Sequence, residues 1–364
     1  MDRQRKIRVL VVDDSAVMRK VISTILDRDA EIEVVATAID GDFAINKAMQ
    51  LKPDVVTLDV DMPRMDGITA LRHIVSKQRA PVLMFSSLTT RDAALTLKAL
   101  EIGAVDFICK PRNSAMMESM AEELVAKVKA AARSRVLPPL DTAPLTLREK
   151  KKHPHAPRLM EPERLVAIGA STGGPHALRS ILPRLPASFE AGIVIVQHMP
   201  ASFTSVMASW LDEICQIDVR EARDHDMIAP GLALIAPGDS HLTVKRTPFG
   251  GTVHLSKGGL VNGHMPSVDV LFRSVAKEYG PRAAGLIMTG MGSDGAEGLG
   301  EIKRAGGFTV AQDKDSCAIF GMPRTAIERG YVDAVAALSD LPARLIAMAG
   351  KPKNMEVLRN GKLS

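Results

Sequence analysis

Short apolar runs rich in β-branched residues alternate with helical patterns along the first 133 residues of the chain. The runs are IRVLVVDD, IEVVATA, DVVTLDVD, PVLMFSS and VDFICKP, and a segment with apolar positions at helical spacing follows each of them. Apolar strands that are separated by helices must be covered on both faces, which is typical of a parallel sheet. The pattern therefore predicts a doubly wound (βα)5 domain over residues 1–133.

The alternation stops between residues 134 and 163, where six prolines and a basic cluster, Arg148 and Lys150 to Lys152, indicate an extended linker. It resumes from residue 164 with RLVAIGA, AGIVIVQH, IDVREA, AAGLIMTG and GFTVAQD. Hairpin-like segments interrupt it at GLALIAPG, HLTVKRT and GTVHLSK. We expect a second doubly wound α/β domain over residues 164–352 with a small antiparallel insertion, followed by a flexible tail at 353–364.

Composition narrows the class of protein. The content of 46% hydrophobic and 24% charged residues is typical of a folded globular chain. A net charge of +5 and only 3% aromatic residues argue against nucleic-acid binding. No apolar run approaches the roughly 18 residues of a membrane span, and no signal peptide precedes Asp13, so we expect no membrane insertion. Three widely spaced cysteines fit a reducing cytoplasm.

Polar side chains follow four strands of the first predicted sheet. Asp13 and Asp14 end the first strand, Asp59 the third, Ser86 the fourth and Lys110 the fifth. The carboxyl ends of parallel strands meet at one edge, where three carboxylates would repel one another unless a hard cation such as Mg²⁺ lay among them. Each acid alone could be a solvated loop residue. Together with a hydroxyl and an ammonium group, they favour a site for a phosphoryl group.

With these residues, the first third of the chain resembles a flavodoxin-like response-regulator receiver domain. The resemblance implies that Asp59 is phosphorylated, that Ser86 and Lys110 contact the phosphoryl oxygens, and that Mg²⁺ is bound by three carboxylates: Asp13, Asp14 and Asp59. A histidine kinase would be the phosphodonor. Phe107 stands where the family usually has a tyrosine, which puts the usual aromatic switch of the family in question.

The glycine-rich segment GASTGG, from Gly169 to Gly174, follows the first strand of the second domain and allows three interpretations. A dinucleotide site needs G-x-G-x-x-G and an acidic residue after the second strand, whereas the glycines of this segment are Gly169, Gly173 and Gly174 and the second strand ends in Gln197-His198. A structural turn without chemistry is the second possibility. The third is a G-x-S-x-G turn that exposes Ser171 as a nucleophile at the start of a helix.

A nucleophilic serine needs a base, and the base needs an orienting acid. His198 ends the next strand, AGIVIVQH, so it should lie beside Ser171. His225 in ARDHDM is the main alternative base, whereas His176 at the helix start is better explained as structural. Asp294 follows the strand AAGLIMTG, and capping of the helix after it is the alternative role. We favour a triad of Ser171, His198 and Asp294.

The segments GASTGGP, VQHMP, APG, MPSVDVLF and TGMGSDGAEGL, joined to a receiver domain, are similar to the chemotaxis protein-glutamate methylesterase (CheB) family. The resemblance implies a carboxylic-ester hydrolase that is activated by phosphorylation from a chemotaxis histidine kinase and needs no cofactor in its esterase site. It would hydrolyse glutamate γ-methyl esters on the cytoplasmic helices of methylated chemoreceptors, release methanol and deamidate receptor glutamines. The family motifs make Ser171 the nucleophile, His198 the base, Asp294 the orienting acid and the backbone N–H of Met291 an oxyanion donor.

Two other functions remain to be compared with this one. A receiver-linked serine hydrolase or amidase acting on a small metabolite would cleave small esters well. A DNA-binding response regulator would need a helix-turn-helix output domain, which the glycine-rich α/β pattern of the second half does not supply. The family resemblance also implies that the unphosphorylated receiver inhibits the esterase.

Overall fold

The computed structural model describes residues 5–78, 80–111, 113, 115–134 and 162–350. The chain divides into two compact units, residues 1–141 and 142–364. Most of the predicted linker and the whole predicted tail lie outside the described residues. Within the described part of the chain, no helix is both long and apolar enough to span a bilayer.

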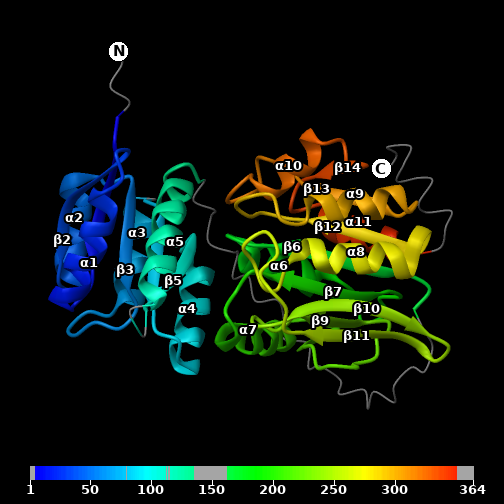
Figure 1. The fold of residues 1–364 in the computed structure, drawn as a ribbon. Coiled ribbons are helices and arrows are strands. Elements are labelled where there is room, and N and C mark those ends of the chain that lie inside the picture. Colours follow the sequence, from blue (N-terminus) through cyan, green and yellow to red (C-terminus); the bar gives the residue numbers. More distant parts are fainter. Residues whose placement is uncertain (1–4, 79, 112, 114, 135–161, 351–364) are drawn as a thin grey trace. The chain divides into compact units, whose positions relative to one another are not determined.

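Five parallel strands form the sheet of the first unit, in the order β2-β1-β3-β4-β5 (Figure 1). This order is the flavodoxin-like one, so the predicted fold is confirmed. Strands and helices alternate strictly: β1 Ile7–Val12, α1 Ala16–Asp27, β2 Ile32–Ala38, α2 Gly41–Leu51, β3 Val55–Asp59, α3 Gly67–Gln78, β4 Val82–Ser86, α4 Thr90–Ile102, β5 Asp106–Cys109 and α5 Ala115–Ala132.

The helices of the first unit bury the apolar strands. On one face, Ile22 of α1 and Leu124 of α5 join Val9 and Phe85 in a single hydrophobic cluster. Helix α2 packs on α3, and α3 packs on α4. Covering the sheet in this way leaves the loops at the carboxyl ends of the strands as the place where polar side chains can gather.

Seven parallel strands form the sheet of the second unit, in the order β14-β13-β12-β6-β7-β9-β8. Its strands are β6 Leu165–Ala170, β7 Gly192–Gln197, β8 Asp218–Glu221, β9 Leu232–Ile235, β12 Ala283–Ile287, β13 Phe308–Gln312 and β14 Ala334–Ala336. The helices are α6 Gly174–Ile181, α7 Ala201–Ile214, α8 Val268–Tyr279, α9 Ala296–Arg304, α10 Met322–Glu328 and α11 Leu341–Ala349, with short 3-10 turns at Leu182–Arg184 and Gly280–Arg282.

The antiparallel insertion is a two-stranded ribbon, β10 His241–Thr247 and β11 Gly250–Ser256, which packs on α8 (Figure 1). The prediction of a hairpin at GLALIAPG was wrong. Strand β9 from this segment joins the main sheet, parallel to both β7 and β8. Its inner residues Ala233, Leu234 and Ile235 are buried, and a strand that is apolar on both faces fits the middle of a covered parallel sheet better than an exposed hairpin.

Candidate functional site

An acidic site lies at the carboxyl edge of the first sheet. Asp13 follows β1, Asp59 ends β3 and Lys110 follows β5. The Lys110 ammonium lies 2.9 Å from Asp13 Oδ2 and 2.7 Å from Asp59 Oδ2. Carboxylate oxygens of Asp13, Asp14 and Asp59 lie within 4.8 Å of one another, with Asp14 exposed and the other two buried. The structure thus brings together the acids predicted from the strand ends.

The charges of this site do not balance, because one ammonium faces two buried carboxylates. Burial raises the pKa of Asp59 to about 6, the charge and hydrogen bond of Lys110 oppose that rise, and the charge of Asp13 adds to it. A cation among these oxygens would remove the repulsion. Three carboxylates, one of them open to solvent, are a donor set that fits Mg²⁺, a hard cation that keeps several of its waters.

Two further residues frame the acidic site. Ser86 ends β4 and its hydroxyl accepts a hydrogen bond of 2.7 Å from the Thr96 hydroxyl of α4. Phe107 of β5 is buried, and the Lys127 ammonium lies 5.3 Å from the centre of its ring. Backbone geometry is also restricted: a Cβ on Gly67 would lie 1.9 Å from the Asp59 carbonyl oxygen, so only glycine lets α3 begin this close to the backbone of Asp59.

In the second unit, Ser171 lies in the turn between β6 and α6, as the G-x-S-x-G interpretation predicted. The turn is closed by a 2.7 Å hydrogen bond from the Gly174 N–H to the Ser171 carbonyl. Gly173 has φ +79°, a conformation that favours glycine, and a Cβ there would lie 2.6 Å from the Ala318 methyl group. The Ser171 N–H donates to the Thr289 carbonyl at 3.0 Å, which ties the turn to the end of β12.

His198 occupies the matching position on the neighbouring strand. In the β6–β7 register Ala170 pairs with Gln197, so Ser171 and His198 are the next residues on adjacent parallel strands. Its Nε2 lies 2.9 Å from Asp294 Oδ2. Its Nδ1 is buried and has no hydrogen-bond partner among the residues that the structure describes. Nδ1 is therefore the nitrogen left to accept a proton.

A second imidazole covers the ring of His198. The His264 ring stacks on it with centroids 3.7 Å apart and planes 13° from parallel. His264 lies in the loop before α8, where its backbone exchanges two hydrogen bonds with Val261. This contact fixes the plane of the His198 ring from one side.

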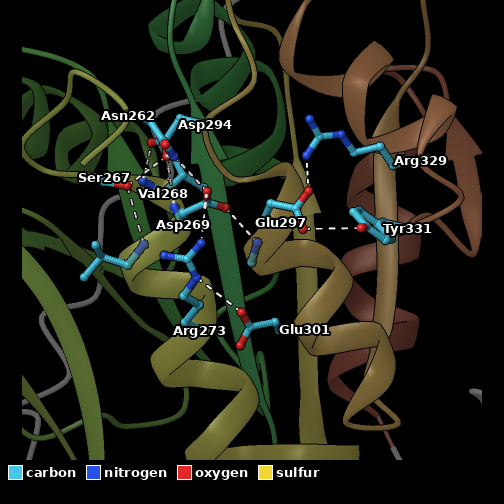
Figure 2. Close-up of polar contacts among 12 residues, drawn as sticks. Asn262, Ser267, Val268, Asp269, Arg273, Asp294, Glu297, Glu301, Arg329 and Tyr331 are labelled. Carbon is cyan, nitrogen blue, oxygen red and sulfur yellow. Dashed lines mark hydrogen bonds and ion pairs between the residues drawn. The ribbon is translucent and has the colours of Figure 1, made fainter.

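Asp294 is held by a dense set of donors at the start of α8 (Figure 2). Its Oδ1 accepts from Asn262 Nδ2 at 2.8 Å and from the Ser267 hydroxyl at 2.8 Å. Its Oδ2 accepts from the Val268 N–H at 2.6 Å. Burial alone would raise the pKa of Asp294, but the hydrogen bond and charge of His198, with the other donors, hold it well below its ordinary value. Asp294 is ionised at neutral pH.

The alternative role of Asp294, capping of the helix that follows it, does not fit this geometry. The cap position of α9 is Gly295, and no side chain caps that helix. The Asp294 carboxylate instead accepts from the Val268 and Asp269 N–H groups of α8, which lies earlier in the chain. A carboxylate at a helix N-terminus is stabilised by the helix dipole, so α8 helps to keep Asp294 ionised.

The loop after β12 also carries the predicted oxyanion donor. The N–H of Met291 has no acceptor among the described residues, whereas the N–H of Gly290 donates to the Ile319 carbonyl at 3.0 Å. A Cβ on Gly290 would lie 2.8 Å from the Ser171 Cβ, so the loop runs directly against the serine. A free N–H at this point of the loop is the kind of group that stabilises a developing oxyanion.

Comparisons with known proteins agree with this site. Residues 166–345 match the CheB methylesterase family model, and residues 9–122 match the response regulator receiver domain model. A protein-glutamate methylesterase/protein-glutamine glutaminase of Koribacter versatilis is 49% identical over 353 residues, which cover 95% of this chain and 97% of the relative. This chain belongs to the CheB methylesterase family. A relative of the same name from Pyrococcus horikoshii is 44% identical over 98% of this chain and 96% of its own length.

The fold of the second unit also matches a solved structure of this family. The CheB methylesterase catalytic domain of Thermotoga maritima is 42% identical, has a TM-score of 0.50, and covers 50% of this chain and 97% of its own chain. The predicted family and fold of the CheB methylesterase unit are therefore confirmed.

Within this CheB methylesterase unit, the main alternative base, His225, makes other contacts. His225 Nε2 is 3.3 Å from Asp224 Oδ2, and its ring packs edge-on against His254. No contact among the described residues joins it to Ser171 or Asp294. His176 lies in the first turn of α6.

Sequence reasoning missed three residues of this site: Asn262, His264 and Ser267. The loop that holds them, KGGLVNGHMPS, has no strand or helix periodicity. Only Ser267 had a signal in the sequence. A serine directly before the apolar pattern VDVLF is typical of a helix N-cap, and Ser267 is the N-cap of α8.

Proposed function

We propose that this chain is a phosphorylation-activated serine esterase that hydrolyses glutamate γ-methyl esters on chemoreceptors and deamidates receptor glutamines. The observation that supports it most is the arrangement of Ser171, His198 and Asp294 at the ends of β6, β7 and β12, three adjacent strands of one sheet. The printed names of the relatives, protein-glutamate methylesterase/protein-glutamine glutaminase, supply the substrate class.

The reaction follows from the positions of the three side chains. Ser171 Oγ attacks the ester carbonyl carbon while His198 Nδ1 takes the hydroxyl proton. Asp294, 2.9 Å from Nε2, stabilises the imidazolium that forms. The Met291 N–H donates to the oxyanion. His198 then returns its proton to methoxide, and methanol leaves.

The acyl-enzyme is cleaved by the same groups in reverse. Water attacks the glutamyl ester of Ser171, His198 takes a proton from that water, and the serine leaves with the proton from His198. The products are a receptor glutamate carboxylate and free Ser171. When the substrate is a glutamine side chain, ammonia leaves in place of methanol and the later steps are unchanged.

The acidic site of the first unit supports regulation by phosphorylation. Asp59 would accept the phosphoryl group from a histidine kinase, and Lys110, already 2.7 Å from its carboxylate, would neutralise one of the added charges. Ser86 would meet a phosphoryl oxygen. Asp13, Asp14 and Asp59 would hold Mg²⁺, which would offset negative charge as the phosphoryl group is transferred.

The deciding experiment measures methanol release from membranes that carry methylated chemoreceptors, with and without a small-molecule phosphodonor. The proposal predicts release that rises with the phosphodonor and is absent in Ser171→Ala. Free glutamate γ-methyl ester is the comparison substrate. A high rate on this free ester together with no release from receptor membranes would favour the small-metabolite hydrolase instead.

A further inference from the structure

The side-chain amide of Asn262 lies between two buried carboxylates (Figure 2). Its Nδ2 is 2.8 Å from Asp269 Oδ2 and 2.8 Å from Asp294 Oδ1. Both aspartates are only 2% exposed. An amide nitrogen carries two hydrogens, so Asn262 can donate one to each carboxylate at the same time.

The backbone of Asn262 is held in a conformation that few residues adopt. Its φ is +53°, in the left-handed region, where asparagine is tolerated better than most other residues. Asn262 is exposed, whereas the two carboxylates that it covers are buried. The loop therefore turns the side-chain amide of an exposed residue inward onto the two carboxylates.

Each of the other donors contacts only one of the two carboxylates, and some of these donors are backbone N–H groups. Asp294 accepts from the Ser267 hydroxyl, and Asp269 accepts from the Gly298 N–H at 2.7 Å. The Arg273 guanidinium lies 3.7 Å from Asp269 Oδ2. Among the residues that the structure describes, Asn262 is the side chain that donates to both.

We propose that Asn262 is a positioning residue for the esterase reaction, which holds Asp294 ionised and aimed at His198 by bridging it to Asp269. The inference rests on the proposed function, because that function makes Asp294 the orienting acid. The carboxylates of Asp269 and Asp294 repel each other, and this repulsion together with burial raises the pKa of Asp269. Two carboxylates in contact without a bridging donor tend to share one proton.

Two variants distinguish the role of the Asn262 side-chain amide from that of its backbone conformation. Asn262→Gly keeps the left-handed conformation and removes the donor. Asn262→Asp keeps the shape and places a third carboxylate where the donor was. We expect kcat to fall roughly 10-fold in Asn262→Gly and up to about 100-fold in Asn262→Asp, with KM changed less, because small displacements of a catalytic group cost about this much.

The pH profile of kcat distinguishes positioning from a general structural defect. In Asn262→Asp the added negative charge stabilises both the protonated carboxylates and the His198 imidazolium. The acidic limb should therefore move to higher pH, and part of the lost rate should return as the pH rises. The charged and titratable groups that face this cluster are Asp269, Asp294, His198, His264, His241, Arg273 and Glu301.

A double variant gives the sharpest test. Asn262→Asp combined with Asp269→Asn exchanges the two groups, which restores the net charge of the cluster and lets the amide at position 269 donate to the carboxylate at position 262. We expect it to recover at least part of the rate and to return the acidic limb toward its original pH. The matched control is His225→Gly, a second non-glycine residue at positive φ, +65°, in the same unit; its activity should be unchanged.

Different outcomes would reject the positioning role of Asn262 and the proposed esterase function. A rate within twofold of the wild type and an unshifted limb in Asn262→Asp would overturn the role of Asn262. If Asp294→Asn also kept full activity, the proposed triad would fail as well. Loss of activity in Asp294→Asn with unchanged Asn262 variants would leave the proposed function intact and remove only this inference. Circular dichroism and thermal unfolding check that each variant is folded.

Discussion

Replacing Asp294 by asparagine removes one of the two oxygens of a carboxylate whose oxygens both face donors. Oδ1 accepts from Asn262 and Ser267, and Oδ2 accepts from the Val268 N–H and lies 2.9 Å from His198 Nε2. The amide nitrogen of asparagine must take one of these places. In either position, the new amide N–H groups would face the donors that the carboxylate oxygen had accepted from. The substitution therefore cannot reproduce the native hydrogen bonds.

The loss of rate and the loss of folding stability expected for Asp294→Asn differ in magnitude. Loss of the carboxylate that selects the histidine tautomer costs about 10⁴ in rate in a triad, or roughly 5 kcal/mol of transition-state stabilisation. Leaving one buried donor unsatisfied costs about 1 to 3 kcal/mol of folding free energy. The stability loss is too small to explain the rate loss, because a domain of ordinary stability stays folded after it.

The assay compares Asp294→Asn with Ser171→Ala for methanol release from methylated receptor membranes, while urea unfolding reports the stability of each. We expect a rate about 10⁴-fold below that of the wild type, still above that of Ser171→Ala, and a lower urea midpoint than in Ser171→Ala. A rate within tenfold of the wild type would refute the role of Asp294 as orienting acid. An unchanged urea midpoint would refute the claim that the hydrogen bonds to both oxygens of Asp294 contribute to folding stability.

Three further predictions concern other parts of the chain. Ser171→Ala should abolish ester hydrolysis but keep phosphorylation of the receiver, measured by acyl-phosphate formation; substantial methanol release by the folded variant would exclude Ser171 as nucleophile. Because the pKa of Asp59 is raised to about 6, its burial favours the protonated form and stability should fall as pH rises from about 4 to 6. Asp59→Asn should remove this fall in thermal unfolding curves, and identical curves would contradict the assigned burial effect. Removing residues 1 to about 150 should raise activity on receptor membranes above that of the resting full-length chain, and no increase would argue against inhibition by the receiver.

The strand ends were the part of the site that the sequence could predict. Asp13, Asp59 and Lys110 in one unit, and Ser171 and His198 in the other, each follow an apolar run, and the carboxyl ends of parallel strands meet at one edge. Their proximity is therefore a consequence of fold class. The local pattern alone was enough to place them.

The loops could not be predicted in the same way. Asn262 reaches Asp294 across 32 positions of the chain, and no periodicity encodes which loop residue will lie over a distant carboxylate. Similarly, the four-residue run of β9 can form a hairpin or a central strand, and only the packing of β7 and β8 on either side decides between them. Helix α10 and strand β14 were missed because each is too short to show a period.

The strand order of the second unit has a consequence for solubility. Strands β6 and β7, which place Ser171 and His198 side by side, are fully buried and almost wholly apolar, and such segments aggregate when their edges are free. The sheet encloses them between other strands and ends at β14 and β8, which have three and four residues. Strand β8 also carries Asp218, Arg220 and Glu221, charges that make a poor template for a strand from another molecule. The apolar strands that assemble the esterase site are thereby kept from edge-to-edge pairing between copies of the chain.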